Sequence, residues 1–284
     1  MRLNYGMKYG LSLIALLSLF KGFVACGAQL YKVSLVGDHG ARIDGRKEGS
    51  PENRNLPYGL HAPGGWTRLP IQFRVGQDLN NDQFRGLQRA MATWETAVGK
   101  KLFAYQGVHQ GTTGDSFPDL FSSLNDQVNG HYLDEHWSKT GKPSIVLATT
   151  IWDNDPNDPD KILTADIRFN SDFYNIGDSL SGKNPSEKEM VDMQTLALHE
   201  LGHLLGLAHI DSSIDPQSIM NPSVFIGEGL ANRRLSKGDI ERIQKIYGCI
   251  GESCAVEKIL AALDATEISQ RKKPSGSSRN TPPQ

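Results

Sequence analysis

The sequence has little net charge and lacks an extended basic region. Its formal net charge is −2, and the basic cluster RKK at residues 271–273 is short. A nucleic-acid-binding protein usually presents a wide positive field, which this sequence does not supply. The composition, with 38% hydrophobic and 22% charged residues, is that of a globular protein. We therefore expect no nucleic-acid partner.

The sequence also lacks an apolar run long enough to span a bilayer in the mature protein. The run LSLIALLSLF occupies only residues 11–20, whereas a transmembrane helix needs about 20 apolar residues. It follows Arg2 and Lys8, and this order of basic and apolar residues is typical of a secretory signal. We expect residues 1–25 to be a signal peptide and the protein to be exported.

Cysteine is scarce, with three residues in the chain. Cys26 ends the stretch FVAC, which resembles the lipobox of bacterial lipoproteins, and a lipid there would tether the protein to a membrane surface. Cys249 and Cys254 would then remain as an even pair, which an oxidising compartment favours as a disulfide. Ordinary cleavage after Ala28 is the alternative. The exported protein is thus secreted, periplasmic or a membrane-anchored lipoprotein.

The pattern of apolar residues divides the chain into four parts. An N-terminal segment, residues 26–64, follows the signal peptide, and a domain with regular patterns covers residues 65–250. Residues 251–284 form a tail that we expect to be largely disordered, because its end is rich in proline and serine. Within the domain we predict strands at residues 71–75, 101–105, 144–151 and 162–169, a surface loop between the second and third of these, and helices at residues 84–98, from Ser186 into the histidine segment, and at residues 235–248.

Three of the eight histidines lie in LALHELGHLLGLAHI, residues 196–210, where the leucines predict a buried helix. His199 and His203 are four residues apart, so their rings project from one face, with Cβ atoms roughly 5–6 Å apart. Two imidazole nitrogens at this spacing can share a zinc ion. Glu200, beside the first ring, is placed to reach water at the metal rather than to become a ligand.

His209 can reach the same ion only if the chain turns back. In a continuous helix it would lie six residues beyond His203, on nearly the opposite face. Gly206 stands between them, and glycine adopts left-handed backbone angles without a Cβ penalty. A single histidine here would be interpreted as a core residue, but burying three imidazoles without a shared partner is costly. We predict that His199, His203 and His209 bind one zinc ion.

HELGHLLGLAH, residues 199–209, resembles the His-Glu-x-x-His-x-x-Gly-x-x-His signature of the metzincin zinc proteases. SIMNPS, residues 218–223, is similar to the methionine turn that lies beneath the metal in that family, with Met220 as its methionine. The stretches GWTRLPIQFRV, ILTADIRFN and LSKGDIERIQKIYG are similar to the matrixin branch. The resemblance, over residues 65–248, implies an α+β fold: a twisted mixed β-sheet, two long helices, an active-site helix ending at Gly206 and a C-terminal helix.

The resemblance also implies a mechanism and a partner. Zinc held by three histidines keeps a position for water and lowers its pKa toward neutrality. Glu200 would act as general base and then as general acid. The substrate would be a protein or peptide that pairs in extended form with an edge strand of the sheet. We therefore expect an exported, monomeric zinc endopeptidase.

Two stretches bear on further metal ions. Animal matrixins carry a structural-zinc histidine in an Asp-x-His-Phe segment, and this sequence reads Asp166-Ile167-Arg168-Phe169. The resemblance therefore does not extend to a second zinc. The loop DNDPNDPD, residues 153–160, has four aspartates that offer ligands for calcium, although a solvated loop is the preferred interpretation.

Two other functions remain open. A surface binding protein could use zinc only to stabilise its fold, but a structural site should be closed by a fourth protein ligand, and the motif offers none. Such a protein would also have no use for Glu200. A zinc hydrolase that acts on a non-peptide amide is disfavoured only by the resemblance.

Overall fold

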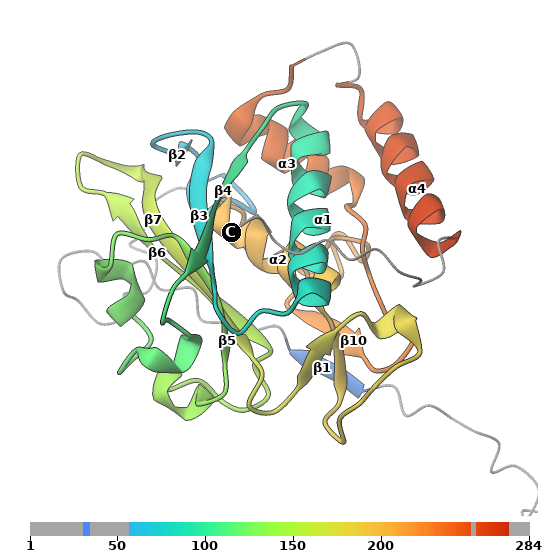
Figure 1. Ribbon diagram of the computed structural model, residues 1–284. Helices are drawn as coiled ribbons and strands as arrows, with labels where there is room; N and C mark the ends of the chain where they lie inside the picture. The colour runs from blue at the N-terminus through green and yellow to red at the C-terminus, as the bar shows by residue number, and fades with distance from the viewer. Residues whose placement is uncertain (1–30, 35–56, 251–253, 273–284) are drawn as a thin grey trace, which may run out of the picture. The chain divides into compact units, whose positions relative to one another are not determined.

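The computed structural model describes residues 31–34, 57–250 and 254–272 (Figure 1). The strands are β1 (Tyr31–Ser34), β2 (Gly65–Trp66), β3 (Ile71–Gly76), β4 (Phe103–His109), β5 (Gly130–Asp134), β6 (Ala148–Asp155), β7 (Asp158–Asn170), β8 (Asn175–Gly177), β9 (Met190–Asp192) and β10 (Ser223–Ile226). The helices are α1 (Asn81–Val98), α2 (Met193–Leu204), α3 (Lys237–Tyr247) and α4 (Val256–Lys272), with four short 3₁₀ helices between β4 and β9. No helix among the described residues has both the length and the apolar character needed to cross a membrane.

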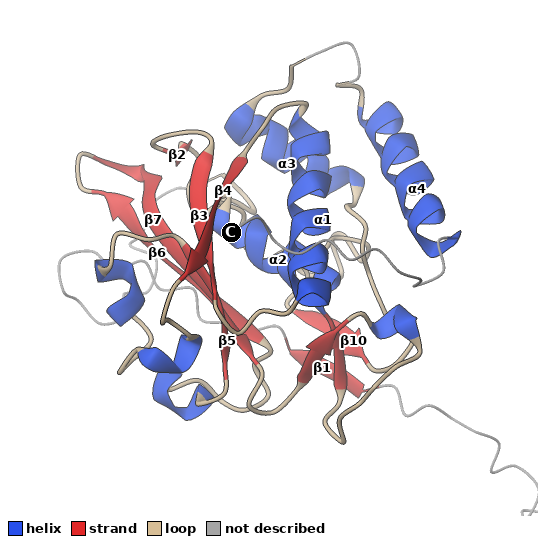
Figure 2. Ribbon diagram, in the orientation of Figure 1, coloured by secondary structure: helices blue, strands red, loops and turns tan. Residues whose placement is uncertain are grey.

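The main sheet has six strands and carries α1 and α2 on one side (Figure 2). Its order is β2-β7-β5-β3-β4, with β6 antiparallel to β7 and the other pairs parallel. Ile167 of β7 pairs with both Thr150 of β6 and His131 of β5, so β6 and β5 lie on opposite sides of β7. β6 is therefore an edge strand, since no other described strand pairs with it. This mixed sheet and its helices confirm the α+β architecture.

The predicted strands at residues 71–75, 101–105, 144–151 and 162–169 correspond to β3, β4, β6 and β7. The sequence predicts a surface loop between β4 and β6, but this segment contains β5, a strand that is buried along its whole length. A parallel strand that is buried on both faces loses the alternation of polar and apolar residues. The sequence GHYLD of β5 also begins with glycine and ends with aspartate, residues that favour turns.

Capping residues fix the first turns of two helices, and α1 begins at Asn81, before the predicted start at residue 84. Asn80 caps α1, and its side-chain oxygen accepts the N–H groups of Asp82 and Gln83. The buried face of α1 packs against α2, and the Trp94 indole N–H donates to the carbonyl of Leu198 over 3.0 Å. α3 begins after Ser236, where Ser236 and Asp239 form a capping box.

The start of α2 corrects the sequence prediction. The Ser-Glu-Lys-Glu pattern at Ser186 predicts a helix start, but α2 begins at Met193, and β9 precedes it. Asp192 is the N-cap, because its carboxylate accepts the N–H of Thr195 over 2.8 Å. Arg233 fixes the same carboxylate with a 3.0 Å hydrogen bond from Nε. The ion pair between Asp192 and Arg233 thus explains why the helix is capped by Asp192 and not by Ser186.

Residues on both sides of the predicted catalytic domain contact it. Residues before Gly65 already contact the domain, since Leu60 forms a β-bridge with Leu207. The Cys249–Cys254 disulfide is present in the structure. The tail predicted to be largely disordered contains α4, in which Ile259 is buried against the core and Glu267 forms an ion pair with Arg234. Its three- and four-residue apolar spacing explains the docking. The predicted signal peptide and Cys26 lie outside the described residues.

Replacing His131 with leucine should reduce the sensitivity of the fold to acid. His131 is fully buried in β5, its ring nitrogens have no hydrogen-bond partner among the described residues, and burial lowers its pKa to about 3. Between its unfolded pKa of 6.5 and that value, the unfolded chain binds a proton that the folded chain does not, so stability falls as the pH falls. At pH 5 this costs about 2 kcal/mol.

Urea unfolding at pH 7 and pH 5 measures this effect. The wild type should lose about 2 kcal/mol more than His131→Leu over this interval. Equal losses in the two proteins would contradict the assignment of a neutral, buried His131 as a source of acid sensitivity.

Candidate metal centre and active site

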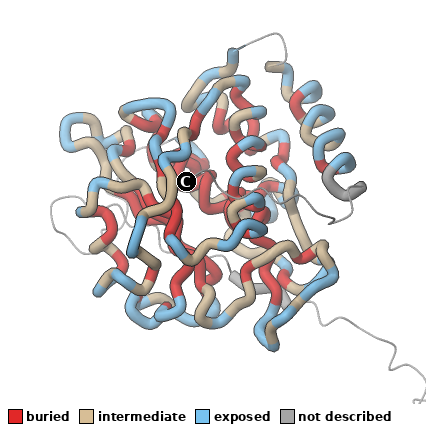
Figure 3. Tube along the Cα trace, viewed as in Figure 1, coloured by how far each residue is buried: buried red, intermediate tan, exposed pale blue. Residues whose placement is uncertain are grey.

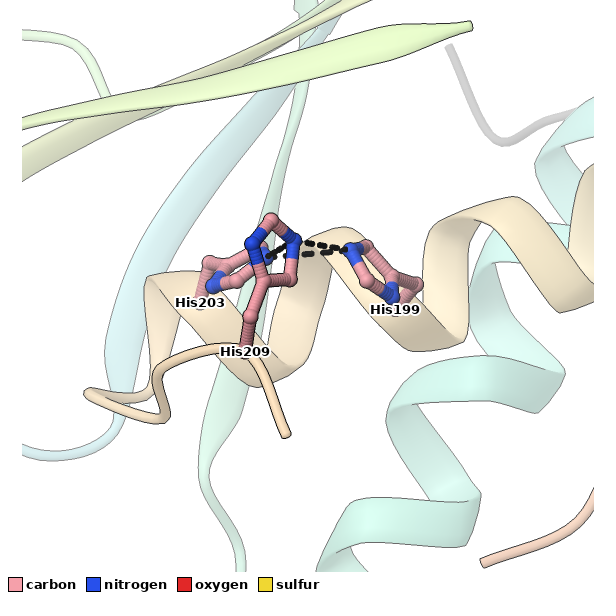
Figure 4. Close-up of side chains that lie close together, drawn as sticks. All are labelled: His199, His203 and His209. Carbon is pink, nitrogen blue, oxygen red and sulfur yellow. Dashed lines mark hydrogen bonds between the residues drawn. The ribbon is translucent and has the colours of Figure 1, made fainter. Parts of the chain in front are cut away.

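α2 carries three of the predicted site residues. His199, Glu200 and His203 all lie on it and are fully buried. The whole helix is enclosed between the sheet and the other helices (Figure 3), which explains why its sequence is leucine-rich rather than amphipathic. The rings of His199 and His203 turn toward each other, with their Nε2 atoms 3.0 Å apart (Figure 4).

The C-terminal end of α2 is fixed by other parts of the chain. The last carbonyls of a helix have no partner within the helix and need one elsewhere. Three side chains meet them: His61 Nε2 lies 2.8 Å from the His203 oxygen, the Trp66 indole N–H donates to Leu204 over 2.6 Å, and the Tyr247 hydroxyl donates to Leu205 over 2.9 Å. These contacts set the point at which the chain leaves the helix.

Gly206 makes the turn that brings His209 back. α2 ends at Leu204, and Gly206 has a φ of +104°, a conformation that favours glycine. The carbonyl of Gly206 accepts the N–H of His61 over 2.9 Å, and the N–H of Ala208 donates to Gly59 over 2.9 Å. The segment before β2 thus holds both sides of the turn. His209 follows directly and points at the other two rings (Figure 4).

Replacing Gly206 with alanine should weaken both the fold and metal binding. A Cβ at this position would lie 2.6 Å from the carbonyl oxygen of Ala62, in addition to the cost of the backbone angle. We expect a loss of about 1–3 kcal/mol and weaker zinc binding, because the turn that carries His209 must shift. Urea unfolding and zinc titration measure the two effects.

Gly141→Ala is a matched control, since Gly141 has a φ of +70° and open space around a Cβ. It should cost some stability while leaving zinc affinity intact. Equal zinc affinity in the Gly206 and Gly141 variants would show that the turn does not position His209.

The three imidazoles converge through one nitrogen each. The Nε2 atom of His209 lies 3.2 Å from the Nε2 atom of His199 and 3.2 Å from that of His203. The Nδ1 atoms of His199 and His203 lie 2.7 and 2.8 Å from the carbonyls of Ile219 and Leu207. A carbonyl accepts a hydrogen bond, so these Nδ1 atoms carry the protons and the Nε2 lone pairs face one another. Three Nε2 lone pairs that face one another repel, and a cation bound by all three would remove this repulsion.

The geometry of this set fits zinc. Three nitrogens bound to a tetrahedral zinc at about 2.1 Å lie about 3.4 Å from one another, close to the separations observed. Neutral imidazole is a preferred zinc ligand, and a backbone carbonyl on Nδ1 is the usual orienting partner of a metal-bound ring. Among the described residues, His199, His203 and His209 are the group of His, Cys, Asp and Glu side chains that could hold a metal ion.

The turn around Met220 supports the same site. The carbonyl of Ile219 accepts the hydrogen bond from His199 Nδ1, and the carbonyl of Met220 accepts the N–H of Ile210 over 2.9 Å. Met220 is fully buried, and a Cβ on Gly202 would lie 2.3 Å from its sulfur. Asp239 of α3 accepts the N–H of Ile219 over 2.9 Å. The turn thus joins α3 to the histidines.

Glu200 lies on α2 between the two helical histidines and faces the sheet. The hydroxyl of Thr150 on β6 donates to Glu200 Oε2 over 2.6 Å. Glu200 Oε1 has no hydrogen-bond partner among the described residues. Burial raises the pKa of Glu200 to about 8, and the hydrogen bond from Thr150 acts in the opposite direction. A metal cation nearby would favour the ionised carboxylate.

The electrostatics of the histidines also suit metal binding. Burial lowers the pKa of His199 to about 3, with a further contribution from His209. Burial likewise lowers the pKa of His209 to about 4. Both rings are therefore neutral at pH 7, and the neutral ring is the form that binds metal.

Sequence patterns predict the three histidines that the structure brings together but miss the residues that contact them from other elements. Thr150, His61 and Trp152 contact the site from outside the motif, and Trp152 stacks on the His61 ring with centroids 4.0 Å apart. Thr150 and Trp152 are two residues apart on β6, so they share one face of the sheet. The alternation of side chains along β6 therefore predicts that Thr150 and Trp152 lie on the same face of the sheet. It does not predict which residues pack against that face.

The segments considered for further metals have other partners. Residues 153–160 include the end of β6, the turn and the start of β7, where the half-exposed Asp158 pairs with Lys161 over 2.9 Å. Arg168 occupies the position of the structural-zinc histidine. It is fully buried, forms an ion pair with Asp134, and donates to the carbonyl of Gly114 over 2.7 Å. A buried cation thus ties β7 to β5 and to the segment before it.

The chain matches the family model described as Matrixin over residues 119–248. It is 45% identical over 58 residues to Metalloendoproteinase 2-MMP of Arabidopsis thaliana, a match that covers 20% of this chain and 14% of that protein. Matrilysin of Felis catus is 45% identical over 58 residues, 20% of this chain and 21% of that protein. Matrilysin of Rattus norvegicus is 40% identical over 86 residues, 30% of this chain and 28% of that protein.

The chain spans less than a third of the length of these curated relatives. The family match nevertheless includes β5, β6, β7, α2, the turn at Met220 and α3, which are the elements that build the site. The fold, the family match and the relatives support a matrixin-like metalloprotease catalytic domain in this part of the chain.

Proposed function

We propose that this protein is an exported, zinc-dependent endopeptidase in which Glu200 is the general base and general acid. The observation that carries the proposal is the convergence of three imidazole Nε2 atoms next to a buried carboxylate on the same helix. Zinc bound to His199, His203 and His209 would supply a Lewis acid that polarises a peptide carbonyl and lets water lose a proton near neutral pH.

Glu200 supplies the proton transfers. Its Oε1 atom is the carboxylate oxygen without a protein partner in the described part of the chain, so it can accept a proton from the attacking water. The same oxygen can then deliver that proton to the nitrogen of the leaving amine. Zinc at the three histidines would favour the ionised form of this buried carboxylate, which is the form that can accept the proton.

The edge of β6 offers a place for an extended peptide. β6 pairs with β7 on one side, and no described strand pairs with its other side. Its inward-facing Thr150 contacts Glu200, so the edge runs past the carboxylate. A substrate strand that hydrogen-bonds to this edge would bring its peptide bonds to the site. We propose proteins or peptides as substrates, acted on by a monomer.

The proposal of export rests on the N-terminal sequence and the cysteines. Residues 1–25 have the order of a secretory signal, and the Cys249–Cys254 disulfide is of a kind that persists in oxidising compartments. Lipidation of Cys26 and cleavage after Ala28 are the two processing routes. Mass spectrometry of the mature N-terminus distinguishes them, because the first leaves a lipid-modified cysteine and the second does not.

Peptides released from a mixed protein substrate test the function. The purified protein should release peptides by internal cleavage, stop when a chelator removes zinc, and resume when zinc is restored. Their sequences would define the bond preference. Zinc binding without peptide release would instead favour a binding protein, or a hydrolase of non-peptide amides if small amides are cleaved. Peptide release that persists after complete removal of the metal would overturn the proposal.

A further inference from the structure

We infer that Thr150 is a positioning residue for Glu200, and that its hydroxyl holds the carboxylate in the orientation in which Oε1 faces the reacting water. The inference rests on the proposed function, because it assigns a role within that reaction. It adds a residue outside the histidine motif, on a strand rather than on α2.

The contact between Thr150 and Glu200 is direct and fully buried. Both side chains have no exposed surface. Thr150 Oγ1 lies 2.6 Å from Glu200 Oε2 and 3.1 Å from the Glu200 carbonyl oxygen. The carboxylate oxygen is the nearer acceptor, and hydrogen bonds to a charged acceptor are about twice as strong as neutral ones. The hydroxyl proton is therefore shared mainly with the carboxylate.

This hydrogen bond distinguishes the two carboxylate oxygens. Without a donor, the terminal torsion of a glutamate side chain has a broad energy minimum, and either oxygen can point in either direction. With Oε2 engaged by Thr150, Oε1 is the oxygen left for a proton, and no described protein group competes for it. Efficient proton transfer requires this kind of fixed geometry.

The strand that carries Thr150 makes it a rigid support. Thr150 lies within β6, in register with Ile167 of β7. Threonine is β-branched, so its side chain has few accessible rotamers. Trp152, on the same face of β6, stacks on His61, and His61 contacts the carbonyl of His203. This face of β6 therefore supports both the base and the end of the ligand helix.

Thr150→Val tests the role, because valine keeps the shape and removes the hydroxyl. We expect kcat on a peptide from the digest to fall about 10–100-fold, the typical cost of losing an orienting partner. KM should stay within about twofold and bound zinc should be unchanged, since the loss concerns a step after substrate binding. Thr150→Ser keeps the hydroxyl and should restore most of kcat.

Thr93→Val is the matched control. Thr93 is a buried threonine on α1 whose hydroxyl donates to the carbonyl of Arg89 over 2.9 Å. Its loss removes a buried hydrogen bond away from Glu200, so kcat should be unchanged. A readout independent of turnover is the melting temperature of the zinc-free protein. Thr150→Val should lower it by about 5 °C, because Glu200 Oε2 is left buried without a donor.

Each outcome bears on the inference. If the wild type is active and Thr150→Val is equally active, the role of Thr150 is overturned and the proposed function stays intact. An unchanged melting temperature of zinc-free Thr150→Val would have the same consequence. A variant that loses zinc, or that serine does not rescue, would show a merely structural role. If the valine variant does not fold, Thr150→Ser and Thr150→Ala give the same comparison, and equal kcat values would overturn the inference. An inactive wild type would overturn both proposals.

Discussion

Glu200→Gln should abolish proteolysis while the protein continues to bind zinc. Glutamine has nearly the same shape, and its amide oxygen can still accept the hydrogen bond from Thr150, but it cannot take up a proton. The loss in kcat should be on the order of 10⁴, the upper range for one residue acting as acid and base. Zinc content should not fall, because the three Nε2 ligands are untouched.

The same substitution should stabilise the zinc-free protein. The folded pKa of Glu200 is about 8, against an ordinary value of 4.5. Between these values the unfolded chain releases a proton that the folded chain retains, so stability falls as the pH rises through this interval. At pH 7 the cost is about 3 kcal/mol. Glutamine does not ionise, so this cost disappears in the variant.

Digestion assays, zinc analysis and urea unfolding measure these effects. Glu187→Gln is the control, because Glu187 is an exposed glutamate in the segment before β9; it should change none of the three quantities. A Glu200→Gln protein that still digests denatured substrate would remove Glu200 from the mechanism. A Glu200→Gln protein that is inactive but no more stable than the zinc-free wild type would support the catalytic role of Glu200. It would contradict the claim that burial of Glu200 destabilises the zinc-free protein.

The cluster of three histidines can be predicted from the sequence because its geometry is local. His199 and His203 depend only on the helical repeat, and the role of Gly206 depends only on what glycine alone can do with its backbone. The structure brings the three Nε2 atoms to within 3.2 Å of one another. The spacing of eleven residues therefore predicts most of the geometry of the candidate metal centre.

The supporting residues are not readable in the same way, because their contacts are distant in sequence. Thr150 and Glu200 are 50 residues apart, and His61 and His203 are 142 apart. Which residue of β6 meets Glu200 depends on the register with β7, and a shift of one residue would turn Thr150 to the other face. The start of α2 depends likewise on an ion pair between Asp192 and Arg233.

His209→Ala should cost at least two orders of magnitude in zinc affinity. Loss of an orienting partner alone typically costs 10–100-fold, and here a ligand atom itself is removed. His209 lies after α2 on the turn at Gly206, so the helix and the other two ligands can remain in place. The protein should fold but bind zinc weakly, and peptide release should fall with zinc occupancy.

Competition with a chelator of known affinity measures this loss, and His136→Ala is the control. The His136 side chain is 58% exposed and pairs with Asp115, on a part of the surface formed by the loop after β5. The control should bind zinc as the wild type does. Unchanged zinc affinity in His209→Ala would mean that the third ring does not bind the metal, although its Nε2 lies 3.2 Å from both partners. Two ligands on one helix would then have to hold the ion alone, and a site so open would not fix zinc firmly enough for the proposed reaction.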